Sequence, residues 1–208
     1  MKKNLTAFFF LLVLLSCNEE SKKTEVDVQP AKRDTQLKIA QPIIHYTTPD
    51  HSPMDMVYFP TDYPLLKMTG KTSKLPYMRI IYSRPQKEGR KIFEDLIKYN
   101  STWRLGANEA TEIEFFSTAT IQGKKIRPGR YILYCVPQAD KWTFVLNSNI
   151  YSWGLQQDRS KDLFQFDVPV EEHTVIEYFT IACEKRSETS VDILFMWDAV
   201  RVKLPVSF

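Results

Sequence analysis

The chain has 208 residues, 43% of them hydrophobic and 13% aromatic, which is enough to bury the core of one domain. Its formal net charge of +3 falls by two, to +1, when Lys2 and Lys3 are removed with the leader predicted below. A chain so close to neutrality has no basic face to displace phosphate counterions, so we predict no nucleic-acid partner.

Residues 1–16 show the features of a lipoprotein signal peptide in the required order. Lys2 and Lys3 precede an apolar run from Phe8 to Leu15, which is shorter than the roughly 20 residues that span a bilayer. The run ends in Leu14-Leu15-Ser16-Cys17, which resembles a bacterial lipobox, so the thiol of Cys17 is predicted to carry the lipid. An ordinary secretory signal with an incidental cysteine, or an uncleaved anchor, remains the alternative.

Residues 17–40 are predicted to be the lipidated Cys17 followed by a flexible polar tether. The segment has few bulky apolar side chains and cannot offset its ordering entropy by burial. Through the lipid, we expect the chain to be held on a membrane of the bacterial cell envelope, at the periplasmic or surface face of the outer membrane. The acidic pair Glu19 and Glu20 resembles a surface-export signal of Bacteroidetes lipoproteins.

Residues 41–208 are predicted to form a single, mostly β domain. Short apolar or alternating runs recur at close spacing, and no long helices alternate with them. This pattern predicts an antiparallel β-sandwich, jelly-roll-like, with one short helix or irregular excursion. We place the helix at 91–97, where Ile92, Phe93, Leu96 and Ile97 fall on one side. The predicted strands cover 77–82, 111–117, 119–121, 124–126, 130–136, 142–146, 175–183, 191–197 and 199–206. Side chains alternate between apolar and polar along 111–117 and 199–206, which predicts one buried and one exposed face for each, and Gln122-Gly123 is predicted to turn a hairpin between 119–121 and 124–126.

The stretch from Tyr82 to Glu112 carries the densest set of arginine, tryptophan, amide and carboxylate side chains that could form a binding site. Alternation along the strand before it places Arg84 on the same face as Met78, Ile80 and Tyr82, at the rim of the core. Guanidinium forks, an indole face and polar side chains suit a carboxylate, phosphate or sugar ligand. The alternative is structural: the arginines pair with Glu109 and backbone carbonyls and fix a long loop to the sheets. The candidate residues are Arg84, Arg90, Trp103, Arg104, Asn108 and Glu109.

Several blocks of this sequence resemble the DUF2911 family of uncharacterised exported bacterial proteins, from about Ser52 to Pro205. The most specific block is Trp103-Arg-Leu-Gly-Ala-Asn-Glu-Ala-Thr111, in which Leu105 replaces the family's usual threonine. Glu94 and Asp95 stand where glycines are common. The resemblance implies a compact, β-rich extracytoplasmic domain and no particular activity. The other matching blocks are Tyr82–Pro85, Gly89–Phe93, Ile121–Lys124, Pro128–Tyr131 and Trp142–Asn147.

Catalytic and metal signatures are weak in this sequence. It lacks a Gly-x-Ser-x-Gly elbow, a phosphate-binding glycine loop, His-Glu-x-x-His and Cys-x-x-Cys, so no catalytic residue, metal or cofactor is predicted. His45 and His51, near Asp50 and Asp55, fit no standard metal spacing and suit a surface loop better. We therefore expect a non-catalytic binding or structural module. A carboxylate-dependent hydrolase acting on an envelope or carbohydrate substrate is the alternative, although Glu112 and Glu114 would need another carboxyl across a cleft.

Cys135 and Cys183 both fall in predicted apolar strands. The oxidising envelope permits a disulfide between them, and two buried free thiols would give the same sequence pattern. Both alternatives remain open from the sequence.

Overall fold

A computed structural model of the protein describes residues 50–208. The predicted leader, the predicted lipidation site Cys17, the predicted tether and His45 lie outside the described residues. The secondary-structure elements are β1 (Met54–Phe59), α1 (Tyr63–Met68), β2 (Met78–Ser83), β3 (Glu112–Phe115), β4 (Ala119–Ile121), β5 (Lys124–Ile126), β6 (Gly129–Pro137), β7 (Lys141–Asn147), a 3₁₀ turn η1 (Arg159–Lys161), β8 (Asp162–Ser187) and β9 (Ser190–Ser207).

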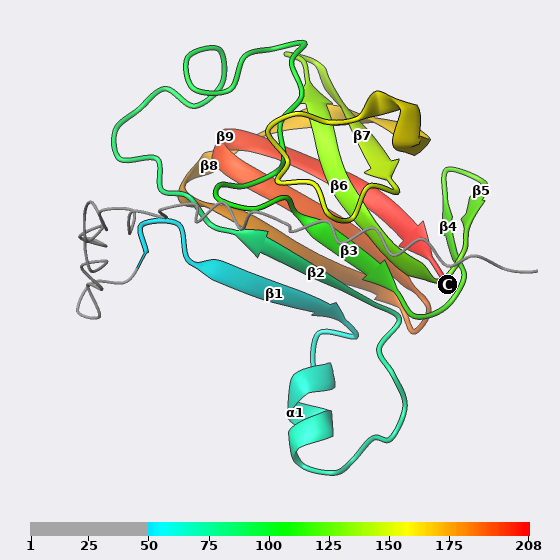
Figure 1. Ribbon diagram of the computed structural model, residues 1–208. Helices are drawn as coiled ribbons and strands as arrows, with labels where there is room; N and C mark the ends of the chain where they lie inside the picture. Colours follow the sequence, from blue (N-terminus) through cyan, green and yellow to red (C-terminus); the bar gives the residue numbers. More distant parts are fainter. Residues whose placement is uncertain (1–49) are drawn as a thin grey trace, which may run out of the picture. The chain divides into compact units, whose positions relative to one another are not determined.

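The nine strands form one antiparallel sheet in the order β1-β2-β3-β6-β7-β8-β9-β4-β5 (Figure 1). Most neighbours in the sheet are also neighbours in the chain, as short turns between antiparallel strands allow. The predicted antiparallel β domain with one short helix is confirmed.

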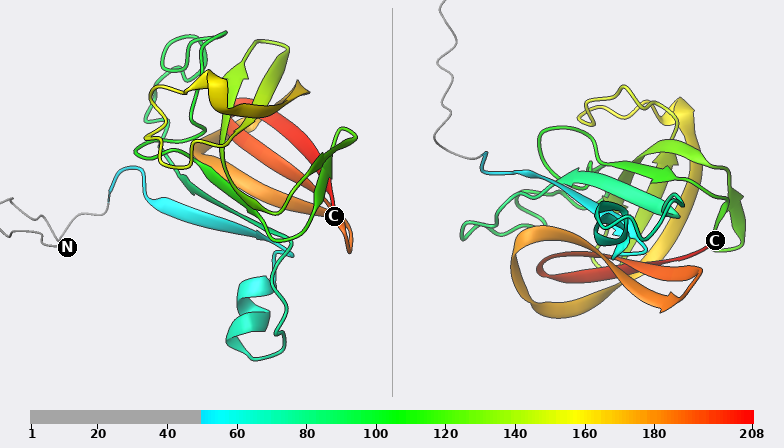
Figure 2. Two further views of the ribbon diagram at one scale, coloured as in Figure 1. Left: turned by 45° about the vertical axis from the view of Figure 1, so that its right-hand side comes forward. Right: turned by 90° about the horizontal axis from the view of Figure 1, so that it is seen from below.

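The sheet folds back on itself because β8 belongs to both of its halves. As far as Pro169, β8 pairs with β7, and from Val170 onward it pairs with β9. Its register with β9 shifts between Glu172 and Ile176 and again before Thr180, and such irregularities bend a strand. The hairpin of β8 and β9 then forms a layer beside β1, β2 and β3 (Figure 2).

A tyrosine hydroxyl joins the two layers. The Oη of Tyr82, on β2, accepts a hydrogen bond from the backbone N–H of Ile181 on β8 at 3.0 Å. It also lies 3.3 Å from the Ile181 carbonyl and from a carboxylate oxygen of Asp55, to which it can donate. Burial raises the pKa of Tyr82 to about 12, so the hydroxyl keeps its proton in the folded protein at neutral pH. The Tyr82 hydroxyl therefore connects β2 to the backbone of β8, which pairs with β9 at Ile181.

The alternation expected from the sequence sets the core. On β3, Ile113 and Phe115 are buried while Glu112 and Glu114 face outward. Glu114 pairs with Arg79 on the neighbouring strand at 2.7 Å, and Glu112 pairs with Arg130. These cross-strand ion pairs occupy the solvent face and leave the apolar face to the core.

The helix prediction was wrong in position. Residues 91–97 form a compact turn instead, in which Glu94 has a φ of 79° and the N–H of Ile97 donates to the carbonyl of Ile92. A residue in the left-handed region cannot continue an α-helix. The helix present is α1, for which Pro64 near its start and Gly70 after its end were the missed sequence signals. No helix within residues 50–208 is long and apolar enough to cross a membrane.

Two strands were also missed or shortened in the predictions. β1 lies in a stretch for which no element is predicted, and β8 begins at Asp162, well before the predicted strand 175–183. In β8 the buried side chains alternate with exposed ones at Phe166 and Val168, so only one face of the strand is apolar.

Candidate functional site

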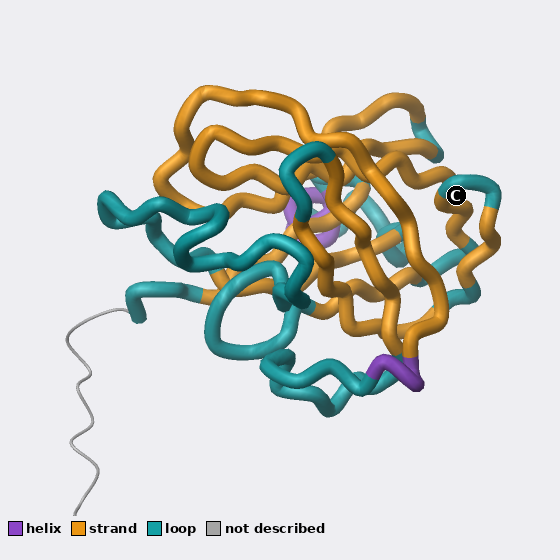
Figure 3. The backbone as a smooth tube through the Cα atoms, turned by 90° about the horizontal axis from the view of Figure 1, so that it is seen from above, coloured by secondary structure: helices purple, strands orange, loops and turns teal. Residues whose placement is uncertain are grey.

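The loop between β2 and β3 is fixed to the edge of β6. Trp103 and Cys135 exchange two backbone hydrogen bonds, of 2.7 and 2.9 Å, and the N–H of Asn100 donates to the carbonyl of Pro137 at 2.9 Å. Thr111 closes the loop, since its hydroxyl donates to the carbonyl of Leu105 at 2.7 Å. Seen from the side opposite α1, the loops gather over one part of the strands (Figure 3).

The indole of Trp103 is part of the core and also lines a cavity. Its ring is 8% exposed and lies 4.9 Å from Phe179, 5.6 Å from Trp142 and 5.9 Å from Trp197, between ring centroids. The indole N–H donates to the carbonyl of Gly106 at 3.3 Å. The contacts with Phe179 and Trp142 are edge-to-face and that with Trp197 is stacked, and together such contacts hold a ring in one orientation. The loop is thus positioned by its tryptophan.

Two glycines allow the loop to pack closely. A Cβ on Gly106 would lie 2.9 Å from the carbonyl oxygen of Ser83, and a Cβ on Gly154 would lie 2.9 Å from the Cβ of Ala110. Leu105, between Arg104 and Gly106, is fully buried with a φ of 57°, in the left-handed region that side chains rarely adopt. The backbone around Arg104 is therefore held by packing against its surroundings.

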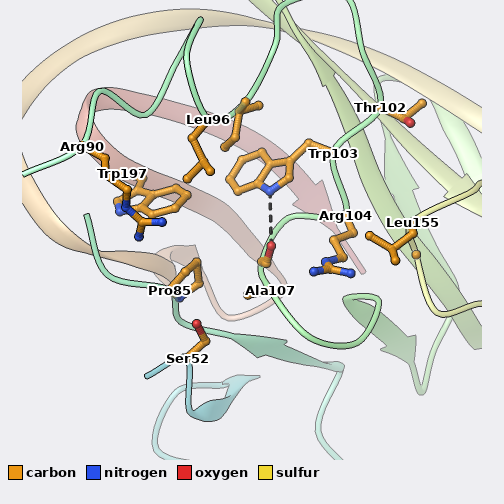
Figure 4. A pocket seen from close by; sticks show the side chains of 13 residues that line it. Ser52, Pro85, Arg90, Leu96, Thr102, Trp103, Arg104, Ala107, Leu155 and Trp197 are labelled. Carbon is orange, nitrogen blue, oxygen red and sulfur yellow. Dashed lines mark hydrogen bonds between the residues drawn. The ribbon is translucent and has the colours of Figure 1, made fainter. Parts of the chain in front are cut away.

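Above Trp103 lies a cavity of about 320 Å³, close to the lower limit for small-molecule sites in proteins. Its walls come from four separate parts of the chain, and most of the side chains are apolar (Figure 4). Two arginines line it, Arg90 and Arg104, and no Asp, Glu or His does. The lining residues are Ser52, Pro85, Arg90, Leu96, Ile97, Thr102, Trp103, Arg104, Gly106, Ala107, Gly154, Leu155 and Trp197.

Arg104 is the residue of this cavity with unused hydrogen-bonding capacity. Within residues 50–208, its buried Nη1 has no hydrogen-bond partner and its guanidinium forms no ion pair. Burial lowers the pKa of Arg104, because a charge loses hydration there. A buried donor without an acceptor is costly, and an anionic ligand would supply that acceptor.

Arg84 and Arg90 have partners. The guanidinium of Arg84 pairs with Asp55 at 3.2 Å, donates to Thr180 Oγ1 at 3.1 Å and lies over the ring of Tyr178. Arg84 thus lies at the core rim, as its position in the strand predicted, and it ties β2 to β1 and β8. Arg90 is exposed and donates to the carbonyls of Lys87 and Gln86, so it stabilises its own turn.

Asn108 and Glu109 do not join the arginines. Asn108, with a φ of 57°, donates to a carboxylate oxygen of Asp50 at 2.9 Å and to the carbonyl of Ser52 at 3.3 Å. Glu109 is exposed and forms no ion pair among the described residues. The sequence left open a structural role in which the arginines pair with Glu109 and backbone carbonyls. Arg84 and Arg90 have such a role, but their partners are Asp55 and backbone carbonyls, and Glu109 is not among them.

Glu109 instead lines a second hollow, of about 280 Å³, on another side of the same loop. Glu112 lines it too, and its carboxylate accepts a hydrogen bond from Arg130 Nε at 3.2 Å. The aromatic side chains at this hollow, Tyr151 and Trp153, are exposed to 92% and 58%.

The two cysteines of the domain are free thiols. Burial raises the pKa of Cys135, which is fully enclosed, and raises that of Cys183 to about 12. Thiols with such pKa values are poor nucleophiles and poor metal ligands at neutral pH. His51 is exposed, 3.6 Å from Glu88, and no group of three or more metal-binding side chains occurs among residues 50–208.

The sequence did not reveal the far wall of the cavity. Gly154 and Leu155 belong to the loop before η1, and Trp197 belongs to β9, so only the fold brings them to Trp103. The sequence did contain one signal for this loop. Large apolar side chains at Tyr151, Trp153 and Leu155 alternate with Ser152 and Gly154, and in the structure this segment is not part of a strand.

Fold and site together define an antiparallel β domain with a small apolar cavity and an unpaired arginine. The family model of DUF2911, "Protein of unknown function", matches residues 65–206, more than half of the chain. The chain belongs to this family, as the resemblance of its Trp-Arg-x-Gly-Ala-Asn-Glu-Ala-Thr block indicated. Comparisons with curated proteins and with solved structures gave no match.

Proposed function

We propose that this protein is an envelope lipoprotein whose β domain binds a small anionic ligand in the cavity above Trp103. The observation that carries the proposal is Arg104, whose side chain lines that cavity and whose buried Nη1 has no acceptor among the described residues. Apolar walls around a small number of charged donors are typical of ligand sites.

The cavity indicates the chemistry of the ligand. A carboxylate or phosphate group would accept hydrogen bonds from Arg104, and Arg90 at the exposed side would add a second positive charge. The rest of the ligand would contact Leu96, Leu155 and Trp197, which favours a planar or apolar body. An aromatic carboxylate such as benzoate satisfies both requirements. A sugar acid supplies the anionic group and can place the C–H face of its ring on the apolar wall, whereas a neutral sugar lacks the anionic group.

Replacing Arg104 with alanine separates a binding role from a structural one. If the guanidinium serves a ligand, the variant loses binding by about 10- to 100-fold, the value of one hydrogen bond to a charged group. Its thermal stability without ligand stays the same or rises, because an unpaired buried charge has been removed. Thermal-shift and calorimetric titrations with benzoate, glucuronate, N-acetylmuramic acid and glucose 6-phosphate would measure both quantities.

Arg84→Ala is the matched control, since Arg84 is also half-buried and is fully paired. It should lower the melting temperature and leave ligand affinity nearly unchanged. Loss of stability in Arg104→Ala equal to that in Arg84→Ala, with no anion stabilising the parent protein, would contradict the proposal.

The lipid anchor of this proposal rests on the sequence of residues 1–17. The order of charged, apolar and small residues before Cys17 supports acylation of its thiol and attachment to the bacterial cell envelope. The expected location is the outer membrane. Intact mass of the protein purified from membranes tests this, since an acylated Cys17 adds the mass of its lipid and Cys17→Ala removes both the lipid and the membrane attachment.

A second candidate function is favoured by the hollow beside Tyr151 and Trp153. It brings the carboxylates of Glu109 and Glu112 to one site next to exposed aromatic rings, an arrangement that suits a carbohydrate chain. If the protein is a carboxylate-dependent hydrolase, Glu109→Gln should lower release of reducing sugar from envelope polysaccharide by at least about 100-fold. Glu114→Gln, on the same face but outside the hollow, should leave it unchanged.

A further inference from the structure

The segment from α1 to Leu75 presents apolar side chains to water. Leu65 is 58% exposed, Met68 78% and Leu75 67%, and α1 contains no buried residue. Figure 1 shows α1 projecting away from the sheet, at the end opposite the loop that carries Trp103. Scattered apolar side chains are normal on a surface, whereas these three lie on one short projection.

Lysines alternate with these apolar side chains along the segment. Lys67, Lys71 and Lys74 are exposed, and none of them forms an ion pair within residues 50–208. No acidic residue occurs from Tyr63 to Tyr77. Two acids adjoin the segment: Asp62, at the start of α1, and Glu188, which lines a hollow with Leu66 and Leu75 and is paired with Lys185. The projection therefore keeps a net positive charge.

We propose that residues 63–75 are a second membrane contact, which binds the anionic surface of a lipid bilayer. Apolar side chains that reach the acyl boundary, with lysines beside lipid phosphates, are the combination by which peripheral segments bind membranes. With six residues, α1 is too short to cross a bilayer and would lie in the headgroup region. The contact is separate from the lipid on Cys17 and from the cavity above Trp103. It would determine which end of the domain faces the membrane and would turn the opposite end, with the cavity, away from it.

The test uses the full lipidated protein in vesicles, with an environment-sensitive fluorophore on Met68→Cys. The background carries Cys183→Ala, Cys135 is fully buried, and Cys17 is blocked by its lipid. We expect blue-shifted emission, and quenching by spin-labelled lipid tails, in phosphatidylcholine vesicles that contain phosphatidylglycerol. A label on Lys98→Cys, in the loop at the other end of β2, should show neither effect.

Charge reversal at Lys67, Lys71 and Lys74 should weaken the contact by at least about a hundredfold, since each lysine near an anionic surface contributes about fivefold. Emission from position 68 that is unchanged by phosphatidylglycerol, or insensitive to the three substitutions, would overturn the proposal. A shift that follows protein density rather than lipid charge would also overturn it and would indicate a second copy of the chain. Intact mass of the same sample reports acylation of Cys17, so failure of the anchor is distinguished from failure of this contact.

Discussion

Trp103→Ala is expected to lower the free energy of unfolding by about 3–5 kcal/mol, the range for large aromatic side chains removed from a core. The indole contacts Phe179, Trp142 and Trp197, and its N–H holds the carbonyl of Gly106. Its removal leaves a void beneath the cavity and frees the loop that carries Arg104. Urea unfolding followed by circular dichroism measures the change.

Trp153→Ala provides the control for this prediction. Trp153 is 58% exposed, whereas Trp103 is 8% exposed. Removing the Trp153 side chain should therefore change the free energy of unfolding by no more than about 0.5 kcal/mol. Trp103→Phe keeps an aromatic ring and should fall between the two. A small and equal loss in both alanine variants would show that Trp103 is not part of the packed core.

Gly106→Ala is expected to cost about 3 kcal/mol, because the added methyl group meets backbone rather than a movable side chain. The new Cβ would lie 2.9 Å from the carbonyl oxygen of Ser83 and 3.3 Å from its nitrogen. Ser83 ends β2 and is fully buried, so neither segment can shift without disturbing the sheet. The variant should also bind any ligand of the cavity more weakly, since Gly106 lines it.

Gly89→Ala is the control that separates the steric clash with Ser83 from the preference of a positive φ for glycine. The φ of Gly106 is 155° and that of Gly89 is 71°, but a Cβ on Gly89 would meet nothing within 4 Å. Its replacement should cost only about 1 kcal/mol, the usual penalty for alanine in the left-handed region. Equal losses in the two variants, measured by the same urea titration, would mean that the approach of Gly106 to Ser83 does not limit packing.

The sequence predicted the features that depend on residues close together in the chain, such as the two faces of a strand and a tight turn. Alternation along 111–117 and 199–206 identified the buried and exposed faces of β3 and β9, because side chains of a strand point to opposite sides at every second residue. The same rule placed Arg84 at the core rim. Gln122-Gly123 gave the turn of the β4–β5 hairpin, where both residues have positive φ.

What the sequence missed depends on contacts between distant segments. The apolar pattern of 91–97 was compatible with a helix, but Ile92, Phe93 and Ile97 are buried by tertiary packing in a turn. Asp55 became the partner of Arg84, and Glu109 did not, because β1 pairs with β2. Of the six candidate residues, only Arg90, Trp103 and Arg104 line the cavity, and the remaining walls come from loops and strands far away in the chain.

The length of β8 has a consequence for how the domain unfolds. One strand supplies hydrogen-bond partners to β7 in its first part and to β9 in its second, across the irregular region from Glu172 to Thr180. Neither half of the sheet is expected to fold as an independent fragment, because without β8 each half would lose the strand that its edge strand pairs with. Loss of order in one half would therefore spread to the other, and the protein should melt as a single cooperative unit.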